Sequence, residues 1–156
     1  MDGVFLMSHS YVVCYIHFVF STKNRIRVIS PDMKERVWAY MGGIARENKM
    51  RALAIGETSD HIHILLSMTQ NISIAKAIQL IKGGSSKWIN ETFGSIGKFA
   101  WQEGYGAFSI GVSGIDDTIA YINAQEEHHR VRTFEEEFVS FLKKNKVEYD
   151  ERYVWG

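Results

Sequence analysis

The chain has 156 residues, of which 46% are hydrophobic and 23% charged, a composition typical of one globular domain with a sizeable core. Its single cysteine, Cys14, excludes an internal disulfide and fits the reducing cytoplasm. No apolar run approaches the roughly 20 residues that span a bilayer, and the acidic start of the chain does not resemble a signal peptide. We therefore expect one cytoplasmic domain over 1–156 without membrane contact, in which residues 1–8 form a loose N-terminal extension.

The formal net charge of zero hides an uneven distribution. Residues 1–100 hold 12 lysines and arginines against 7 acids, a net of +5, whereas residues 101–156 hold 6 against 11, a net of −5. A localised basic face can bind phosphate even when the whole molecule is neutral. An unevenly charged solvated surface would give the same pattern, so charge alone does not indicate nucleic-acid binding.

The first half of the chain predicts a strand, a helix and a hairpin. Residues 11–20 are rich in β-branched and aromatic side chains and predict a buried strand. A helix is predicted from Pro31 to about Asn48, because proline suits the first helical turn and apolar residues follow at helical spacing. Strands at 51–57 and 61–68 are separated by a short polar turn and should pair as a hairpin.

A second helix is predicted over 74–92, with Ser73 positioned to cap its N-terminus. Gly83 and Gly84 interrupt its pattern, and there we expect a bend or the close approach of another backbone. A glycine-rich aromatic stretch comes next, and residues 109–112 predict the last strand.

Two helices complete the predicted order, one over 115–130 and one that starts with the capping-box pattern of Thr133 to Glu136 and ends near Asn145. The order β-α-β-β-α-β followed by two helices predicts an α+β fold, a ferredoxin-like (RRM-like) split βαβ domain with an antiparallel sheet. Helices would cover one face of this sheet, and the 61–68 strand would be central. The other face would be free for substrate or for partner helices.

Two histidines stand at alternate positions of the fourth predicted element. Because strand side chains alternate between faces, His61 and His63 point the same way and offer two imidazoles to one metal ion. Asp60 precedes them and is positioned to orient a histidine as a hydrogen-bond acceptor. When such a pattern stands alone, it more often marks two partly exposed sheet histidines than a metal site.

Tyr121 and Gln125 lie four residues apart in a predicted helix and so share one helical face. The amide oxygen of Gln125 would be a third ligand for the ion, which leaves coordination positions open for substrate oxygens. Tyr121 would be the nucleophile, activated close to the cation because a phenol ordinarily has a pKa near 10. The phosphodiester backbone of DNA is the substrate that such a site suits best.

Six segments in this order closely resemble the small HUH transposases with one catalytic tyrosine, namely the TnpA-like enzymes of single-strand insertion sequences and the related REP-associated tyrosine transposases. The resemblance covers residues 10–155. The segments are His17-Phe-Val-Phe-Ser-Thr-Lys23, Asp60-His-Ile-His-Ile-Leu-Leu-Ser67, Ile81-Lys-Gly-Gly-Ser-Ser-Lys-Trp-Ile-Asn90, Trp101-Gln-Glu-Gly-Tyr-Gly-Ala-Phe108, Tyr121-Ile-Asn-Ala-Gln-Glu-Glu-His-His129 and Tyr149-Asp-Glu-Arg-Tyr153.

The resemblance implies a metal-dependent DNA strand transferase. His61 and His63 match the HUH pair, Tyr121 matches the nucleophile, and Gln125 matches the third metal ligand. The substrate implied is single-stranded DNA next to a hairpin, cleaved through a 5′-phosphotyrosine linkage that leaves a free 3′-hydroxyl, with Mg²⁺ or Mn²⁺ as the metal. The family also implies a homodimer in which the tyrosine helix can dock on the partner, so that each site is composite.

Contacts to the DNA hairpin are expected from two basic groups. Lys23, Arg25 and Arg27 follow the first strand, and Lys82 and Lys87 belong to the second helix. Positive side chains at these places would contact phosphates without reading sequence.

Three alternatives remain open from the sequence. One is a non-catalytic RRM-like nucleic-acid-binding module, although the chain lacks the RNP1-like pattern of that class. A second is a metal-dependent phosphodiesterase that uses water in place of Tyr121. A third is a domesticated relative that cuts hairpin repeats of its host without moving its own gene.

Overall fold

The structure is a computed structural model that describes residues 10–25, 27–58, 60–94, 98–125 and 133–154. The predicted loose extension at 1–8 lies outside these residues. The elements in chain order are β1 Tyr15–Ser21, η1 Lys23–Arg25, α2 Pro31–Glu47, β2 Arg51–Glu57, β3 His61–Ser67, α3 Ile74–Thr92, β4 Gly106–Ile110, η3 Val112–Gly114, α4 Ile115–Asn123 and α6 Phe134–Lys144. Within the described ranges, no helix is long and apolar enough to cross a bilayer.

The strands form one four-stranded antiparallel sheet in the order β2-β3-β1-β4. This order confirms the predicted α+β fold and the 51–57/61–68 hairpin, and it places the histidine strand β3 in the interior of the sheet. In β1 and β3, Val19 lies opposite His63, and Ser21 lies opposite His61. Residues opposite each other in an antiparallel pair lie on the same face, so this register decides which side chains surround the histidines.

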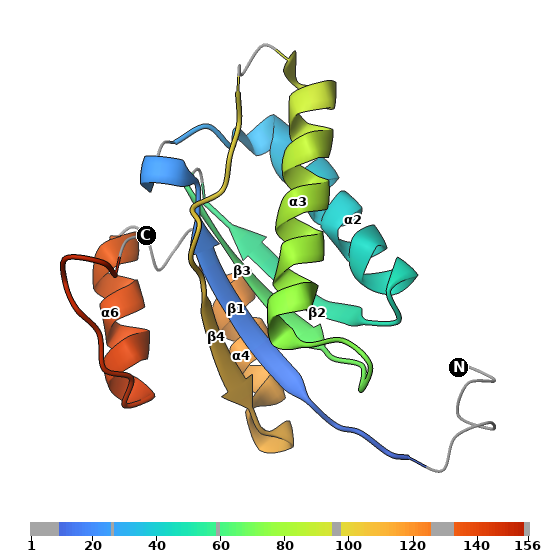
Figure 1. Cartoon of the computed structure of the whole chain (residues 1–156), viewed down its shortest axis with the longest axis vertical. Helices are drawn as coiled ribbons and strands as arrows, with labels where there is room; N and C mark the ends of the chain where they lie inside the picture. Colours follow the sequence, from blue (N-terminus) through green and yellow to red (C-terminus); the bar gives the residue numbers. More distant parts are fainter. Residues whose placement is uncertain (1–9, 26, 59, 95–97, 126–132, 155–156) are drawn as a thin grey trace.

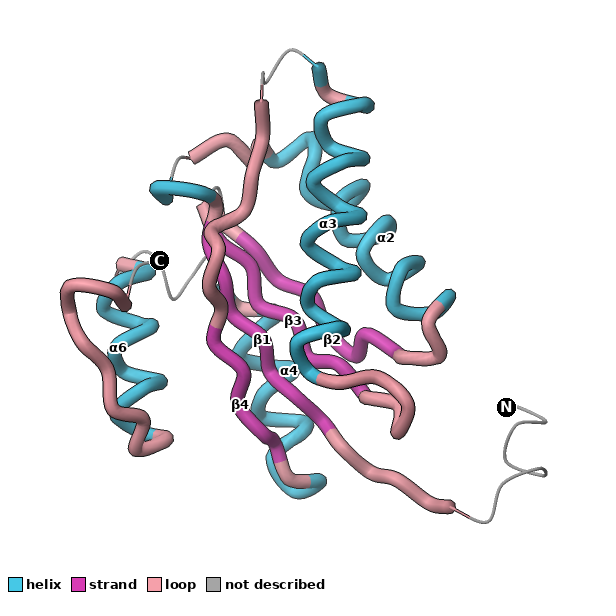
Figure 2. Tube along the Cα trace, viewed as in Figure 1, coloured by secondary structure: helices cyan, strands magenta, loops and turns pink. Residues whose placement is uncertain are grey.

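One face of the sheet is apolar and packs under α2 and α3 (Figures 1 and 2). We call it the apolar face; β1 and β3 contribute Ile16, Phe18, Phe20, Ile62 and Ile64 to it. All of these side chains are buried, and each contributes about 1.5–3 kcal/mol by leaving water. The two helices cross here because Gly84 of α3 leaves room for the side chain of Ile44 of α2.

The opposite face, which we call the histidine face, carries His17, Val19, His61, His63 and Leu65. It is covered by α4 and α6 of the same chain, which corrects the expectation of a free face. The apolar members of this face explain the difference. Leu65 and Val19 need burial, and α4 and α6 supply it through their own apolar side chains.

Helix starts agree with the predicted capping residues. The Ser73 hydroxyl accepts a hydrogen bond of 3.0 Å from the Lys76 amide at the start of α3. At the start of α6, the side chains of Thr133 and Glu136 form a complete capping box. The capped start of α6 fixes the orientation of a helix that supplies a residue to the site described below.

Two predicted strand boundaries are wrong, and two helix predictions need comment. β1 begins at Tyr15 rather than 11, and the last strand is Gly106–Ile110 rather than 109–112, because pairing with β1 begins where Gly106 lies opposite Val19. Helix α3 runs through Gly83 and Gly84 without interruption, and only the predicted close approach is found there, to a side chain rather than a backbone. Helix α4 ends at Asn123, and residues 126–132 lie outside the described part of the chain.

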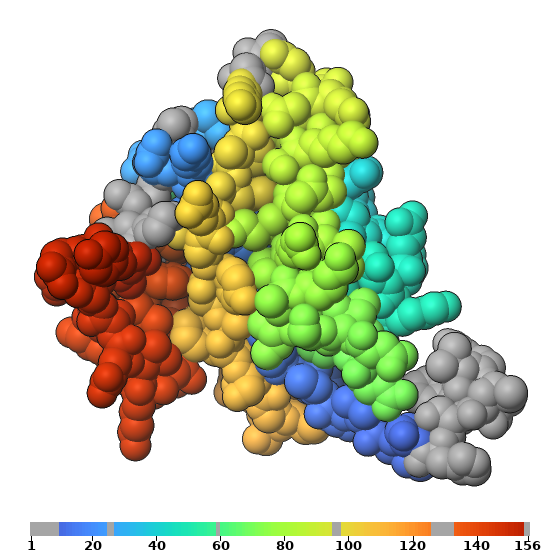
Figure 3. All heavy atoms as spheres, in the orientation of Figure 1, coloured from blue at the N-terminus to red at the C-terminus, as the bar shows by residue number. Residues whose placement is uncertain are grey.

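The space-filling view shows α3 and the segment 98–110 forming much of one side of the molecule, with α6 and the residues after it along its edge (Figure 3). The packing of α4 and α6 encloses the histidine face, and its histidines are buried inside the protein.

Candidate functional site

Three histidines lie next to one another on the histidine face. His61 and His63 alternate with Ile62 on β3, and the antiparallel register brings His17 of β1 beside His63. All three are buried, with exposed fractions of 0%, 0% and 2%. A buried polar group is costly unless it is hydrogen-bonded, so the partners of these rings determine what the site can do.

The Nδ1 atoms of His61 and His63 are both held by other side chains. His61 Nδ1 lies 2.8 Å from Asp60 Oδ1 and 2.8 Å from Thr58 Oγ1. His63 Nδ1 lies 2.8 Å from His17 Nε2. The two rings are thus fixed from behind, and both Nε2 atoms face the space beneath α4 and α6. This is how the ligand histidines of metal sites are ordinarily oriented.

Glu137 of α6 occupies the centre of that space. Its Oε1 atom lies 2.8 Å from His63 Nε2 and 3.6 Å from His61 Nε2, and its side chain is fully buried. Its other oxygen, Oε2, accepts a short hydrogen bond from the Tyr121 hydroxyl. One carboxylate therefore connects both histidines with the phenol.

Tyr121 and Gln125 approach the histidines from the end of α4. The Tyr121 ring lies 5.8 Å from the His63 ring between centroids. Gln125 follows the end of α4, is buried, and has its Oε1 atom 3.4 Å from His61 Nε2. Its amide nitrogen donates to the Tyr121 carbonyl at 3.3 Å, which links the two residues directly.

Gly56 of β2 allows α4 to sit this close to the sheet. A Cβ atom at this position would collide with the carbonyl oxygen of Ile122, the residue after Tyr121. The side chain of Ile122 is buried against Ala54 and Leu65. The missing side chain at residue 56 thus lets the last turn of α4 bring Tyr121 to the histidines of its own chain.

The electrostatics of the site follow from burial and from these contacts. Burial is the main reason why the pKa of His17 falls to about 3, with a further contribution from His63, so His17 is neutral. For Asp60, burial alone would raise the pKa, but the hydrogen bond to His61 and its charge outweigh that effect, with help from Thr58 and Arg27, and the pKa is lowered. Asp60 is therefore ionised and holds the Nδ1–H of His61.

The chemistry of this cluster suits a metal ion. One ligand atom each from His61, His63 and Glu137 all lie within 4.8 Å of one another, and all three residues are buried. Gln125 adds an amide oxygen beside His61. Imidazole nitrogen with carboxylate and amide oxygen is a donor set for divalent cations such as Mn²⁺ and Mg²⁺.

Sequence reasoning missed Glu137 and His17. Glu137 stands between Phe134 and Phe138, so it belongs to the buried stripe of α6, and an acid at an apolar helical position was the available signal. His17 alternates with Val19 in the same way that His61 alternates with His63. Their meeting depends on the β1–β3 register and on where α6 docks, which no local pattern contains.

The five predicted DNA-contact residues do not form one group. Lys23 and Arg27 are exposed near the histidine end of the sheet, and the charge of Arg27 reaches Asp60. Lys87 is exposed on α3, the layer that covers the apolar face. The side chain of Arg25 lies outside what the structure describes.

Lys82, predicted to contact phosphate, makes contacts inside the protein. Its ammonium donates to the carbonyl oxygens of Glu103 at 3.2 Å and Gly104 at 3.0 Å, and it lies 5.4 Å from the centroid of the Phe20 ring. Burial lowers its pKa to about 8. Lys82 therefore ties α3 to the segment before β4, and two of its three donors are used inside the protein.

Comparison with known proteins identifies the family. Residues 10–125 match the family described as transposase, IS200 like. This chain belongs to the IS200-like transposase family. The transposase of insertion sequence element IS200 from Salmonella typhimurium strain LT2 is 27% identical over 111 residues, which are 67% of this chain and 72% of that protein. The IS200 transposase from Salmonella typhi has the same identity and coverage.

Two solved structures share the fold of this IS200-like transposase. A candidate transposase from Deinococcus radiodurans R1 superposes with a TM-score of 0.61 at 19% identity, covering 74% of this chain and 95% of the other. A REP-associated tyrosine transposase bound to a REP hairpin superposes with a TM-score of 0.59 at 13% identity, covering 78% and 72%. The histidine, tyrosine and glutamine cluster thus lies on the fold that these proteins share.

Proposed function

We propose that this transposase cleaves and rejoins single-stranded DNA next to hairpins through a 5′-phosphotyrosine intermediate formed on Tyr121, with a divalent metal ion. The observation that carries the proposal is the convergence of a phenol, two imidazole Nε2 atoms and a buried carboxylate at one point. The relative solved with a REP hairpin supports the choice of substrate.

His61, His63, Gln125 and Glu137 would hold the metal ion. Their donor atoms fit Mg²⁺ or Mn²⁺, and Asp60 and Thr58 fix His61 in the orientation that a ligand needs. His63 would be a ligand through Nε2 in the tautomer that carries its hydrogen on Nδ1, where His17 Nε2 lies at 2.8 Å to accept it. When bound, the cation would polarise a phosphoryl oxygen and compensate the charge that develops there.

Tyr121 would attack the phosphorus atom of the scissile phosphodiester. A bond would form between the phenol oxygen and phosphorus, and the bond from phosphorus to the 3′ oxygen would break. The leaving 3′ oxygen would take up one proton from water, which gives a free 3′-hydroxyl on one strand. Glu137 accepts the hydrogen bond of the phenol and so orients the oxygen and receives its proton. Attack by a 3′-hydroxyl on the phosphotyrosine reverses these steps and joins strands.

The hairpin would be held by Lys23, Arg25 and Arg27, with Lys87 of α3 as a more distant contact. Lys23 and Arg27 are exposed, and Arg27 acts on Asp60, which itself holds His61. We also propose that the protein forms a homodimer. Since Tyr121 lies on the histidines of its own chain, such a dimer would not be needed to complete a site.

The test is incubation with hairpin oligonucleotides from the DNA that flanks the gene, labelled at the 5′ or the 3′ end, with Mn²⁺ or EDTA. We expect an adduct on a denaturing gel that resists SDS, requires the metal and retains the 3′ label. Tyr121→Phe should abolish it. Tyr153→Phe is the matched control, because Tyr153 is 72% exposed and lies far along the chain from the site, and it should keep full adduct formation.

Other outcomes would favour the alternatives. Cleavage without an adduct would replace the tyrosine chemistry by a nuclease that uses water. Binding without cleavage on several flanking hairpins would favour a non-catalytic nucleic-acid-binding module. Cleavage of hairpin repeats elsewhere in the host genome, with none at the flanks of the gene, would favour a domesticated nuclease.

A further inference from the structure

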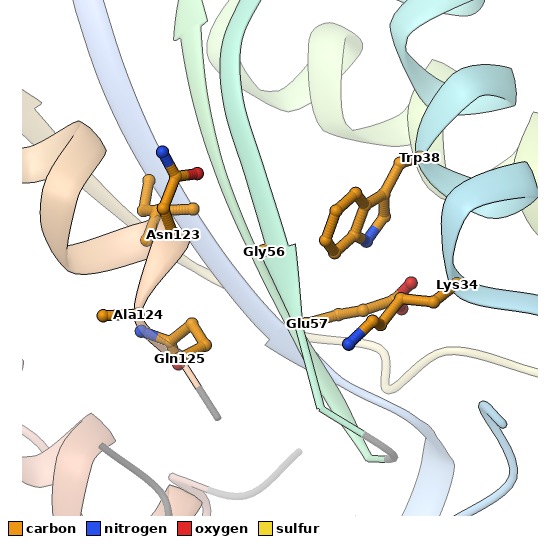
Figure 4. Close-up of a pocket in the computed structure, with 8 residues that line it drawn as sticks. Lys34, Trp38, Gly56, Glu57, Asn123, Ala124 and Gln125 are labelled. Atoms are coloured by element: carbon orange, nitrogen blue, oxygen red, sulfur yellow. The ribbon is translucent and has the colours of Figure 1, made fainter. Parts of the chain in front are cut away.

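A pocket of about 370 Å³ wraps around the edge of the sheet at β2 (Figure 4). Lys34 and Trp38 of α2 line it on one side, Glu57 lies at the end of β2, and the residues from Ile122 to Gln125 line it on the other side. Its volume is in the range of small-ligand sites. Since Gln125 belongs both to this pocket and to the histidine cluster, a ligand bound here would lie beside the proposed site.

Glu57 is the feature of this pocket that the fold does not explain. Its side chain is 1% exposed, and neither carboxyl oxygen has a hydrogen-bond partner among the described residues. The indole N–H of Trp38, the donor nearest to Glu57, is close enough to lower the pKa of Glu57 but is also buried without a hydrogen bond of ordinary geometry. Buried polar groups are almost always satisfied, and a bound water, ion or ligand is one explanation of an exception.

The protonation of Glu57 also follows from its surroundings. Burial raises its pKa to about 8, against smaller opposing effects of Lys34 and Trp38. At neutral pH the group is therefore mainly a neutral carboxylic acid, with one oxygen that accepts and one hydroxyl that donates. Glu57 points away from the histidines, because it lies opposite Ile62 of the apolar face in the β2–β3 register.

We propose that this pocket binds one unpaired nucleobase of the single strand beside the scissile phosphate, with the base along Trp38 and its hydrogen-bonding edge on Glu57. The inference rests on the proposed function. Trp38 is half-buried, so part of its indole is open to the pocket, and aromatic faces stack on unpaired bases. Lys34, whose ammonium lies 5.7 Å from the Trp38 ring centroid, adds positive charge to the lining.

The chemistry of Glu57 suits the hydrogen-bonding edge of any base. Adenine and cytosine each present an amino donor next to a ring-nitrogen acceptor, and thymine and guanine each present a ring N–H donor next to a carbonyl acceptor. Each of these pairs matches the acceptor and donor of a neutral carboxyl. We therefore assign the pocket to one unpaired base of any type.

The test measures binding in the Tyr121→Phe background, so that it does not depend on strand cleavage. Fluorescence anisotropy would compare fluorescein-labelled (dA)12, (dC)12 and (dT)12 in Mg²⁺. We expect Glu57→Leu to weaken the binding of each oligonucleotide by roughly 5- to 150-fold, the contribution of one bidentate base contact. The pocket of this variant has no polar edge to hold the base.

Two further variants keep the result interpretable. Glu57→Gln should retain the affinity of the Tyr121→Phe parent, because its amide offers an acceptor and a donor in the same places. Glu47→Leu, a change of an exposed acid at the end of α2, is the matched control and should also retain this affinity. Melting followed by circular dichroism verifies that each variant folds.

The outcomes separate this inference from the proposed function. An unchanged affinity in a folded Glu57→Leu variant overturns the base pocket, as does a lack of binding to all three oligonucleotides. If the affinity depends on Glu57 while no covalent adduct forms on any flanking hairpin, the pocket stands and the tyrosine chemistry falls. If adducts form and the affinity does not depend on Glu57, the pocket alone falls.

Discussion

The two faces of one sheet carry opposite kinds of side chain, although they alternate along the same strands. On β3, Ile62 and Ile64 face α2 and α3 in an apolar core, whereas His61 and His63 face α4 and α6 in a buried polar cluster. The apolar face gains stability from every side chain that it buries. The histidine face places histidines, an amide, a phenol and a carboxylate in the same low-dielectric interior, where each needs a partner.

The difference indicates where stability and chemistry reside in this fold. Any loss of side-chain volume on the apolar face should lower the stability of the fold, because its side chains are close-packed. The histidine face tolerates apolar contacts only around its polar centre, where Phe134 and Phe141 pack on the histidine rings. The predictions below test this division, and they run from the largest expected effect to the smallest.

The first prediction asks whether one chain completes its own histidine face. Tyr121 lies on the histidines of the same chain, so co-expressed Tyr121→Phe and His63→Ala subunits should form no adduct with a labelled hairpin. In a dimer of one subunit of each variant, one site would lack the Tyr121 hydroxyl and the other would lack the His63 imidazole. Recovery of adduct formation in the mixture, with neither variant active alone, would mean that α4 reaches the partner's histidines and that the sites are composite.

The second prediction concerns the apolar face. Phe18→Ala removes a fully buried ring from the core and should lower the free energy of unfolding by about 3–5 kcal/mol, measured by urea denaturation. The matched change is Phe141→Ala, because Phe141 is half-buried on the histidine side and should cost less. Equal losses would show that both faces contribute alike to stability.

The third prediction weakens the support of the histidine cluster without touching its Nε2 atoms. Asp60→Asn replaces the ionised acceptor behind His61 Nδ1 and should lower the Mn²⁺ affinity by about 10- to 100-fold, measured by titration calorimetry. Asp150→Asn is the control, since that acid is paired with Arg152 on the surface. Unchanged affinity in Asp60→Asn would remove Asp60 from the site.

The fourth prediction uses the pH dependence of stability. The pKa of Glu57 is about 8 in the folded protein against 4.5 as its ordinary value, so the folded state keeps a proton that the unfolded state loses. The Glu57 contribution is therefore fully present below pH 4.5, declines as the pH rises towards 8, and changes no further above it.

We expect stability to fall by about 1.4 kcal/mol per pH unit between about pH 5 and pH 7, measured by urea denaturation. This fall should be absent in Glu57→Gln, whose side chain does not titrate. A Glu57→Gln variant with the same pH dependence as the wild type would mean that the groups facing it, Lys34 among them, hold Glu57 ionised.

Local patterns in the sequence predicted the fold and part of the site. Alternation placed His61 and His63 on one face. The spacing of four placed Gln125 beside Tyr121, although α4 ends at Asn123 between them. The capping residues Ser73 and Thr133 marked helix starts correctly, because a cap is a contact between residues three apart. Such features depend on neighbours in the chain.

The rest depends on contacts between distant parts of the chain. Glu137 reaches His63 across 74 residues, and His17 reaches it across 46. The start of β4 follows from its register with β1, which the glycine-rich stretch before it does not reveal. The histidine face was expected to be free, because the docking of α4 and α6 depends on contacts between distant parts of the chain. Leu65, Val19 and Phe108 take part in those contacts.

The lack of a side chain at Gly56 means that a single substitution there can change the equilibrium between docked and undocked α4. Any side chain at this position would act as a wedge under the carbonyl of Ile122. Gly56→Ala would therefore shift the population towards an undocked α4, carrying Tyr121 and Gln125 away from the histidines together. One methyl group on β2 would then favour a form in which Tyr121 lies away from the histidines. Each chemical group of the site would remain unaltered in that form.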